Sequence, residues 1–307
     1  MIVEAHCHPF GPLSHDDLSD KVRTVEDLIA FRRNYPQIYE TRHTSPIVDY
    51  MDAIIDDMDK YGVDKAVVMP TFCSVESDAK NAQTVEAIKK HPGRLFGLMH
   101  LGWDESMAAD ISDDPIPLRA DAPTQIDRWI GQHGLRGIAE SHGGPFTTEI
   151  HPVKIAEDLR PIMEAVARYN VPVLFATGWT QFPGRMYHAD PIYVDEIAGR
   201  YPDVPIVLTK MGRGIAHYFE SALIVAMRNP NVYFDTTYSS GEHIRRAGRT
   251  IGADRMMFGS DWAVVWRWVR DPEDLYSARL RAVRESGLSM AEQAQILGKT
   301  AEKLFRV

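Results

Sequence analysis

The chain reads Ile2-Val3-Glu4-Ala5-His6-Cys7-His8-Pro9 close to its amino terminus. A short apolar and β-branched run of this kind predicts a β-strand. Because successive side chains of a strand point to opposite faces, His6 and His8 are expected on one face and Cys7 on the other. Two imidazoles on one face can bind a single metal ion, whereas a pair of buried, hydrogen-bonded histidines is the structural alternative.

Short apolar runs recur along the whole chain and alternate with longer amphipathic segments. This alternation predicts βαβ units and a parallel sheet. Eight such units with short connections predict an α/β fold with a closed (β/α)₈ TIM barrel over residues 1–307, and an open doubly wound sheet is the alternative. Strands are expected at 2–5, 65–69, 95–99, 135–139, 171–175, 206–208, 232–234 and 255–258, and helices at 46–61, 79–91, 154–169, 190–201, 215–228 and 272–286.

Two segments are longer than a minimal barrel needs. Residues 9–45 follow the first predicted strand, and residues 103–123 follow the third. Loops of this length are uncommon unless they are functional or disordered, and in a barrel both lie on the active-site face. Residues 9–45 are therefore predicted to form a lid, and residues 103–123 a lid or an oligomer contact. Residues 289–307 have the pattern of a terminal helix on the barrel exterior.

The overall composition excludes several classes of partner. The 307 residues carry a formal net charge of −9, which disfavours binding to nucleic acid. No apolar run approaches the roughly 20 residues that span a bilayer. The first residues do not show a basic region followed by an apolar stretch, so we expect no secretory signal. The two cysteines, Cys7 and Cys73, are too few for a disulfide framework. We expect a cytoplasmic protein with a small-molecule substrate and no membrane partner; a homo- or hetero-oligomer stays open.

A second motif, Phe258-Gly259-Ser260-Asp261-Trp262, ends the last predicted strand. A barrel closes its eighth strand against its first, so Asp261 is expected beside His6 and His8. An aspartate after Gly-Ser is otherwise often a turn former or a cap. The two motifs together predict a metal site at the carboxyl end of the barrel.

These motifs, with the tail Leu297-Gly298-Lys299-Thr300-Ala301-Glu302-Lys303-Leu304-Phe305, resemble the amidohydrolase superfamily. More narrowly, they resemble the amidohydrolase-related branch that includes aminocarboxymuconate-semialdehyde decarboxylase and resorcylate decarboxylase. The resemblance follows the strand order along the whole chain. It implies a TIM-barrel enzyme with a divalent metal ion, zinc first and manganese or iron as alternatives. It also implies His6, His8 and Asp261 as ligands, with Asp261 as the general base in hydrolytic members.

The chain departs from this family at two positions. Where the family usually has a histidine after strand five, this chain has Ala176, and where a histidine follows strand six it has Lys210. A standard mononuclear site has thus lost one ligand, and a standard dinuclear site most of the shell of its second metal.

Glu140 and Lys210 are the candidates to compensate. Glu140 ends the fourth predicted strand and can complete the metal shell, as strand-four groups do in some relatives, or it can pair with Lys210 or an arginine. Lys210 beside a dication should have a lowered pKa, which would suit it to acid–base or Schiff-base chemistry. Alternatively, Lys210 neutralises Glu140 or binds a substrate carboxylate.

Several other side chains are expected at the mouth of the barrel. We predict that Arg213, Trp179, His142 and Trp262 contact the substrate, and the guanidinium of Arg213 suits a carboxylate. Asp235 is a further polar group that is expected there.

The leading functional hypothesis is a metal-dependent hydrolase or non-oxidative decarboxylase. It would act on a small carboxylate- or amide-bearing substrate through a metal-activated water or a metal-polarised substrate. Two histidines and one carboxylate are also the ligand set of non-heme iron oxygenases, so an oxygenase on the same barrel is an alternative. A catalytically degenerate barrel that serves as a partner subunit is the third.

Overall fold

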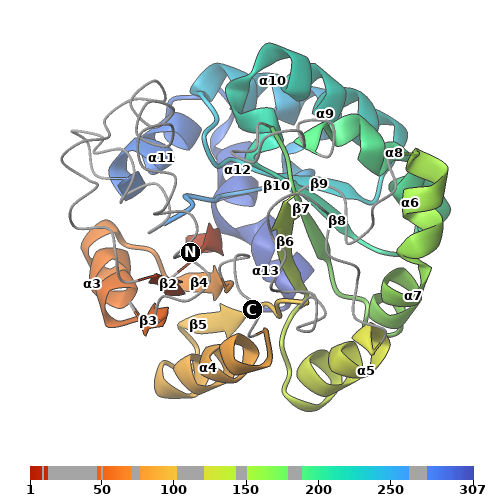
Figure 1. Cartoon of the computed structure of the whole chain (residues 1–307). Coiled ribbons are helices and arrows are strands. Elements are labelled where there is room, and N and C mark those ends of the chain that lie inside the picture. The colour runs from red at the N-terminus through yellow and green to blue at the C-terminus, as the bar shows by residue number, and fades with distance from the viewer. Residues whose placement is uncertain are drawn as a thin grey trace, which may run out of the picture.

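The computed structural model describes residues 1–8, 10–12, 47–49, 51–70, 77–101, 121–142, 151–178, 189–262 and 275–307. Eight parallel strands of this part of the chain surround a central axis, and helices ring them (Figure 1). The barrel strands are β1 (Val3–Cys7), β4 (Lys65–Val68), β5 (Leu95–Gly97), β6 (Ile138–His142), β7 (Val173–Ala176), β8 (Ile206–Thr209), β9 (Val232–Asp235) and β10 (Met256–Met257).

Backbone hydrogen bonds close these strands into a barrel. Strands β1, β4 and β5 form one run of neighbours, and β6 to β10 form another in sequential order. The nitrogen of Ala139 donates to the oxygen of Met99 at 2.8 Å, which joins β5 to β6. The nitrogen of Ala5 donates to the oxygen of Phe258 at 2.8 Å, which joins β1 to β10. The predicted TIM barrel is confirmed, and the open doubly wound sheet is wrong.

The helices lie outside the strands and pack on them through apolar faces (Figure 1). A helix or helical pair follows each strand, as βαβ crossovers require. Helical segments of the described residues are α3 (Met51–Tyr61), α4 (Ser77–Lys90), α5 (Ala122–Ile126), α6 (Pro152–Asp158), α7 (Arg160–Tyr169), α8 (Val194–Arg200), α9 (Ala216–Arg228), α10 (Gly241–Ile251), α11 (Leu275–Arg284), α12 (Met290–Ala294) and α13 (Thr300–Phe305).

The terminal segment differs from its prediction. Residues 289–307 are helical, but Ala301 and Phe305 of α13 pack with Val3 and Ala5 in the cluster that fills the barrel. The backbone of Met1 also lies against Gly298, so this segment covers the amino ends of the strands. Apolar side chains at the amino ends of the strands would otherwise be exposed to water. Helix α13 covers them and for that reason does not lie on the outer wall of the barrel.

Three other element boundaries differ from the sequence patterns. The predicted helix 46–61 begins only at α3, because Ile47–Asp49 forms strand β3, as its β-branched residues favour. The predicted helix 154–169 is two helices, since Pro161 lacks the N–H that would continue α6. Strand β6 begins at Ile138 instead of Leu135, after the turn that contains Gly134.

Most of the two long segments, 9–45 and 103–123, lies outside the described residues, and the prediction of a lid therefore falls largely outside them. The ends of the first segment do meet, because β2 (Phe10–Pro12) pairs antiparallel with β3. Among the helices that the structure describes, none combines the length and apolar character that a membrane span requires.

Packing between β5 and its neighbours leaves no space at Gly97. A methyl group there would lie 2.5 Å from Cγ2 of Thr84 and 2.8 Å from Cδ1 of Ile88. We expect Gly97→Ala to lower the free energy of unfolding by about 1–3 kcal/mol, measured by chemical denaturation. Gly199→Ala is the control, because its methyl group meets only Oδ1 of Asn229 at 3.7 Å and helix α8 gains helix propensity. Equal effects of both substitutions would contradict this packing.

Candidate metal centre

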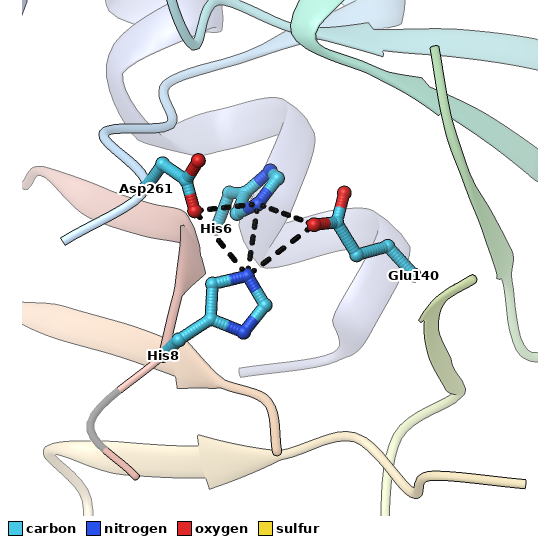
Figure 2. Close-up of side chains that lie close together, drawn as sticks. All are labelled: His6, His8, Glu140 and Asp261. Atoms are coloured by element: carbon cyan, nitrogen blue, oxygen red, sulfur yellow. Dashed lines mark hydrogen bonds and ion pairs between the residues drawn. The ribbon is translucent and has the colours of Figure 1, made fainter. Parts of the chain in front are cut away.

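Four side chains converge at the carboxyl end of the barrel, and Figure 2 shows them pointing toward one another: His6, His8, Glu140 and Asp261. His6 lies in β1 and His8 follows it, Glu140 lies in β6, and Asp261 follows β10. All four are buried, and one ligand atom of each lies within 4.8 Å of the others. The structure therefore brings together all four residues that the sequence analysis named as metal ligands.

The spacing of these ligand atoms matches a small divalent ion. The Nε2 atoms of His6 and His8 are 3.2 Å apart. Oε1 of Glu140 lies 3.4 Å from both nitrogens, and Oδ1 of Asp261 lies 3.4 and 3.3 Å from them. Ligands about 2.0–2.1 Å from a tetrahedral ion are separated by roughly 3.3–3.4 Å. Among the residues that the structure describes, Oδ1 of Asp261 is also a buried oxygen with no hydrogen-bond partner, as expected for an atom that binds a metal ion. The donor set fits a divalent ion.

Glu4 holds the backbone where the two ligand-bearing strands meet. Pairing of β1 shifts register between Glu4 and Cys7, which leaves backbone groups to be satisfied. Oε1 of Glu4 accepts hydrogen bonds from the nitrogens of His6 at 2.8 Å and Ser260 at 3.0 Å. Burial raises the pKa of Glu4 to about 8, against the lowering effect of these two bonds. Glu4 is thus a neutral acid at neutral pH, and the sequence analysis did not identify it.

Asp235 orients His6. Nδ1 of His6 donates to Oδ2 of Asp235 at 2.8 Å, a role we assign because it leaves Nε2 unprotonated toward the ligand cluster. The other oxygen of Asp235 accepts from the nitrogens of Lys210 at 3.1 Å and Thr237 at 2.9 Å. Carboxylates behind metal-bound histidines fix the ring and raise its basicity. Asp235 was expected at the mouth, and its contact with His6 gives it this role.

Lys210 lies inside the same cluster. Its Nζ donates to both oxygens of Glu140 at 2.6 Å and lies 3.3 Å from Nε2 of His6 and 3.9 Å from Oδ2 of Asp261. Burial alone would raise the pKa of Glu140, but the charges of Lys210 and His6 hold it well below its usual range. Glu140 therefore pairs with Lys210, which is one of the two predicted alternatives, and it also lies beside the other candidate ligands, as the second alternative requires.

The charges of the buried cluster balance with one divalent ion. The carboxylates of Glu140, Asp261 and Asp235 contribute three negative charges, and Lys210 contributes one positive charge. A single dication brings the sum to zero, whereas a second would leave uncompensated positive charge in a buried site, which is costly. The ammonium group of Lys210 therefore favours a mononuclear site.

Tyr238 is a site residue that the sequence analysis missed. Its hydroxyl donates to Oδ2 of Asp261 at 2.9 Å, and burial, reinforced by the negative charge of Asp261, raises its pKa well above the usual range. No motif marks this tyrosine. Its only sequence signal is its place three residues after Asp235, at the carboxyl end of β9.

Backbone strain coincides with the site. Lys210, Arg213, Tyr238 and Asp261 all have positive φ, at 67°, 56°, 60° and 60°. Non-glycine residues in this region cost about 1–3 kcal/mol each and persist where the surrounding structure holds them, often at functional sites. These four residues project toward one region from three different loops.

The other predicted site residues are distributed as follows. Arg213 stacks over the ring of Tyr238, with its guanidinium carbon 5.2 Å from the ring centre. Trp262 is buried in the core and its indole donates to Asp57 at 2.8 Å, so it packs the barrel against α3 and does not wall the pocket as predicted. Trp179 and the side chain of His142 lie outside the described residues. Sγ of Cys7 points to the backbone of Val67, away from the ligands as expected.

Comparisons with known proteins agree with this architecture. A family model described as amidohydrolase matches residues 3–307. A 5-carboxyvanillate decarboxylase from Sphingomonas paucimobilis superposes with a TM-score of 0.65 at 16% identity, over 100% of this chain and 99% of that chain. A 4-oxalomesaconate hydratase from Rhodopseudomonas palustris gives 0.63 at 17% identity, over 100% and 96%.

A dihydroxybenzoic acid decarboxylase from Polaromonas sp. JS666, with bound manganese and the inhibitor 2-nitroresorcinol, gives a TM-score of 0.61 at 16% identity, over 99% of this chain and 96% of that chain. No curated protein sequence matches the chain. At these identities the structural likeness establishes the fold alone.

The raised pKa of Glu4 predicts a pH-dependent stability. The folded protein holds a proton on Glu4 between about pH 4.5 and 8 that the unfolded chain releases, so stability falls as pH rises through this window. Glu4→Gln keeps an oxygen acceptor for both backbone groups but cannot titrate. We expect the wild type to lose roughly 3–5 kcal/mol relative to this variant across the window, measured by urea denaturation at several pH values. Parallel pH profiles for the two proteins would show that Glu4 is already ionised at neutral pH.

Proposed function

Because the chain belongs to the amidohydrolase family over residues 3–307 and is an enzyme of that family, we propose that it is a metal-dependent, non-oxidative decarboxylase of a small acid. The observation that carries this proposal is the position of Lys210, a buried ammonium 3.3 Å from Nε2 of His6. A proton donor at that position suits a reaction that generates a carbanion. In the proposed site, His6, His8, Glu140 and Asp261 hold the metal ion.

The metal ion, when bound, would polarise an oxygen of the substrate and orient the carboxylate that leaves. The protein supplies the proton. As the bond to the carboxyl carbon breaks, carbon dioxide departs and its electron pair stays on the remaining carbon. Lys210 then gives that carbon a proton and regains one from solvent. An ammonium has three N–H groups, and Glu140 accepts two of them. Nζ also lies 3.3 Å from Nε2 of His6, and the third N–H group would become available to the substrate when that nitrogen binds the metal.

Hydrolysis is the second candidate, and the surroundings of Asp261 make it the less favoured one. A hydrolase needs a base to take a proton from water. Oδ1 of Asp261 faces the two histidines, and Oδ2 already accepts a hydrogen bond from Tyr238. Neither oxygen is well placed to accept a proton from water.

The oxygenase and the degenerate barrel are less well supported. Non-heme iron oxygenases combine two histidines and one carboxylate with open positions. Glu140 adds a fourth donor to this cluster and so reduces the positions available for oxygen and substrate. Complete loss of catalysis is difficult to reconcile with a buried donor set whose charge balances with one dication.

Two substitutions of Lys210 separate proton donation from charge balance. Lys210→Arg keeps a positive charge beside Glu140 but does not release its proton at neutral pH, and Lys210→Met loses both. We expect both variants to lower kcat by about 10²–10⁴-fold, with one metal ion per chain retained in Lys210→Arg. The measurement is carbon dioxide release from a panel of aromatic and aliphatic acids, with metal content determined for each protein.

Deuterium labelling identifies the reaction. In heavy water, a decarboxylase places one deuteron on the carbon that lost carbon dioxide. Normal turnover by Lys210→Arg would contradict the proposed donor and leave Lys210 as a charge partner. Water-derived oxygen in the product, without carbon dioxide release, would replace the decarboxylase with the hydrolase. Substrate-dependent oxygen uptake with iron bound would point to the oxygenase.

A further inference from the structure

Thr209, the last residue of β8, contacts the candidate ligand Glu140. Its Oγ1 donates to Oε2 of Glu140 at 2.6 Å, and both side chains are buried. Oγ1 also lies 3.2 Å from the carbonyl oxygen of Phe175. A hydroxyl has one proton to donate, so we assign it to the shorter contact with the charged acceptor, which is the stronger hydrogen bond. Thr209 is therefore a donor to one particular oxygen of the carboxylate.

The two oxygens of Glu140 have different surroundings. Oε2 accepts from Thr209 and from Nζ of Lys210. Oε1 also accepts from Lys210, but it faces the Nε2 atoms of His6 and His8, each at 3.4 Å. Because Lys210 contacts both oxygens alike, the hydroxyl of Thr209 is the contact that distinguishes them. It engages Oε2 and leaves Oε1 directed at the two histidines.

The strand ends bring this donor to Glu140. Glu140 lies in β6 and Thr209 in β8, on either side of β7. The β7 residue that pairs with Thr209 is Ala176. Leu174 and Val207 pack inside the barrel, so the alternation of side chains along each strand puts Ala176 and Thr209 on the same inner face. The small methyl group of Ala176 therefore leaves space for a contact that spans β7.

A turn at Lys210 directs two consecutive residues at the same carboxylate. Neighbouring residues of a strand normally point to opposite faces. The φ of 67° at Lys210 ends this alternation, so that Nζ of Lys210 and Oγ1 of Thr209 both reach Glu140. Thr177 holds the turn, because its Oγ1 donates to the oxygen of Thr209 at 2.6 Å and accepts from the nitrogen of Gly212 at 2.9 Å. Thr209 is thus fixed through its backbone as well as through its hydroxyl.

We propose that Thr209 is a positioning residue of the metal centre, whose hydroxyl makes Glu140 bind the metal ion through Oε1 alone. This inference rests on the proposed function, because it assumes that Glu140 is a metal ligand. Groups that hydrogen-bond to metal ligands fix the direction of those ligands, and their loss typically lowers metal affinity roughly 10–100-fold. Without the hydroxyl of Thr209 the carboxylate can rotate, so the ion is held less tightly and both oxygens can reach it.

Thr209→Val tests this role, because valine keeps the branched shape of threonine and replaces the hydroxyl group with a methyl group. The probe is cobalt(II), added alone to protein that a chelator has freed of metal. Titration gives the affinity, and the visible absorption of bound cobalt reports its geometry, since absorption weakens as the number of ligand atoms rises. We expect Thr209→Val to bind cobalt roughly 10–100-fold more weakly than the wild type, with weaker absorption per bound ion. Thr209→Ser, which keeps the hydroxyl group, should restore the affinity and the spectrum.

Thr84→Val is the matched control. Thr84 is as fully buried as Thr209, and its hydroxyl donates to the oxygen of Lys80 at 2.9 Å within helix α4. The same exchange of a hydroxyl for a methyl group should leave cobalt affinity and absorption unchanged there. Circular dichroism verifies the folding of each variant. Thr209→Ala also lacks the hydroxyl group and replaces the valine variant if that variant does not fold.

The outcomes separate this inference from the proposed function. Unchanged cobalt affinity and absorption in Thr209→Val would overturn the role of Thr209, and so would an equal loss in Thr209→Ser or in Thr84→Val. A wild-type protein that binds no cobalt would overturn the metal centre and this inference together. The expected effects on cobalt binding, without carbon dioxide release from the panel of acids, would support the role of Thr209 and overturn only the decarboxylase.

Discussion

The contact between the first and last strands of the barrel positions three of the four candidate ligands, His6, His8 and Asp261. The nitrogen of Asp261 donates to the oxygen of His6 at 2.9 Å, and this bond joins residues from opposite ends of the chain. Glu4 reinforces the same contact through the nitrogens of His6 and Ser260. Because both hydrogen-bonded residues carry candidate ligand atoms, closure of the barrel and assembly of the metal centre are one event. A displacement of either strand would separate the histidines from the aspartate.

The second constraint is charge balance in the buried site, and it gives a physical reason for a lysine at position 210. A buried site with several carboxylates needs an equal positive charge. Lys210 supplies part of it directly to Glu140, and one dication would supply the rest. Unlike a metal ion, the ammonium group of a lysine can also donate a proton. We therefore expect Lys210 to serve both as a charge partner of Glu140 and as an acid beside the proposed metal ion.

The sequence alone was enough to predict the TIM barrel and to name the four candidate metal ligands. The regular alternation of apolar runs predicted the barrel, and the two end motifs predicted His6, His8 and Asp261 because closure places them together. Glu140 was predicted as a compensating ligand, because the family resemblance implies histidines at positions 176 and 210 that this chain does not have. Tyr238 and Glu4 were not predicted, since no sequence pattern distinguishes them. Their roles depend on particular contacts: one hydrogen bond from Tyr238 to Asp261, and two that Glu4 accepts from backbone nitrogens. Trp262 was predicted to contact the substrate because it follows β10 at the mouth of the barrel. Its ring lies instead in the hydrophobic core, where the indole donates a hydrogen bond to Asp57.

Local sequence patterns also could not predict where residues 289–307 pack. Its helical period is the same whether Phe305 faces the barrel interior or the outer wall, and only the three-dimensional space at the amino ends of the strands distinguishes the two.

A crystal structure of the protein grown with zinc or manganese, with diffraction recorded at the metal absorption edge, tests the metal-site assignment most directly. The account predicts one anomalous peak about 2.0–2.3 Å from His6, His8, Glu140 and Asp261, with Lys210 still bonded to Glu140. An absent peak, with Nζ of Lys210 at that position instead, would contradict it.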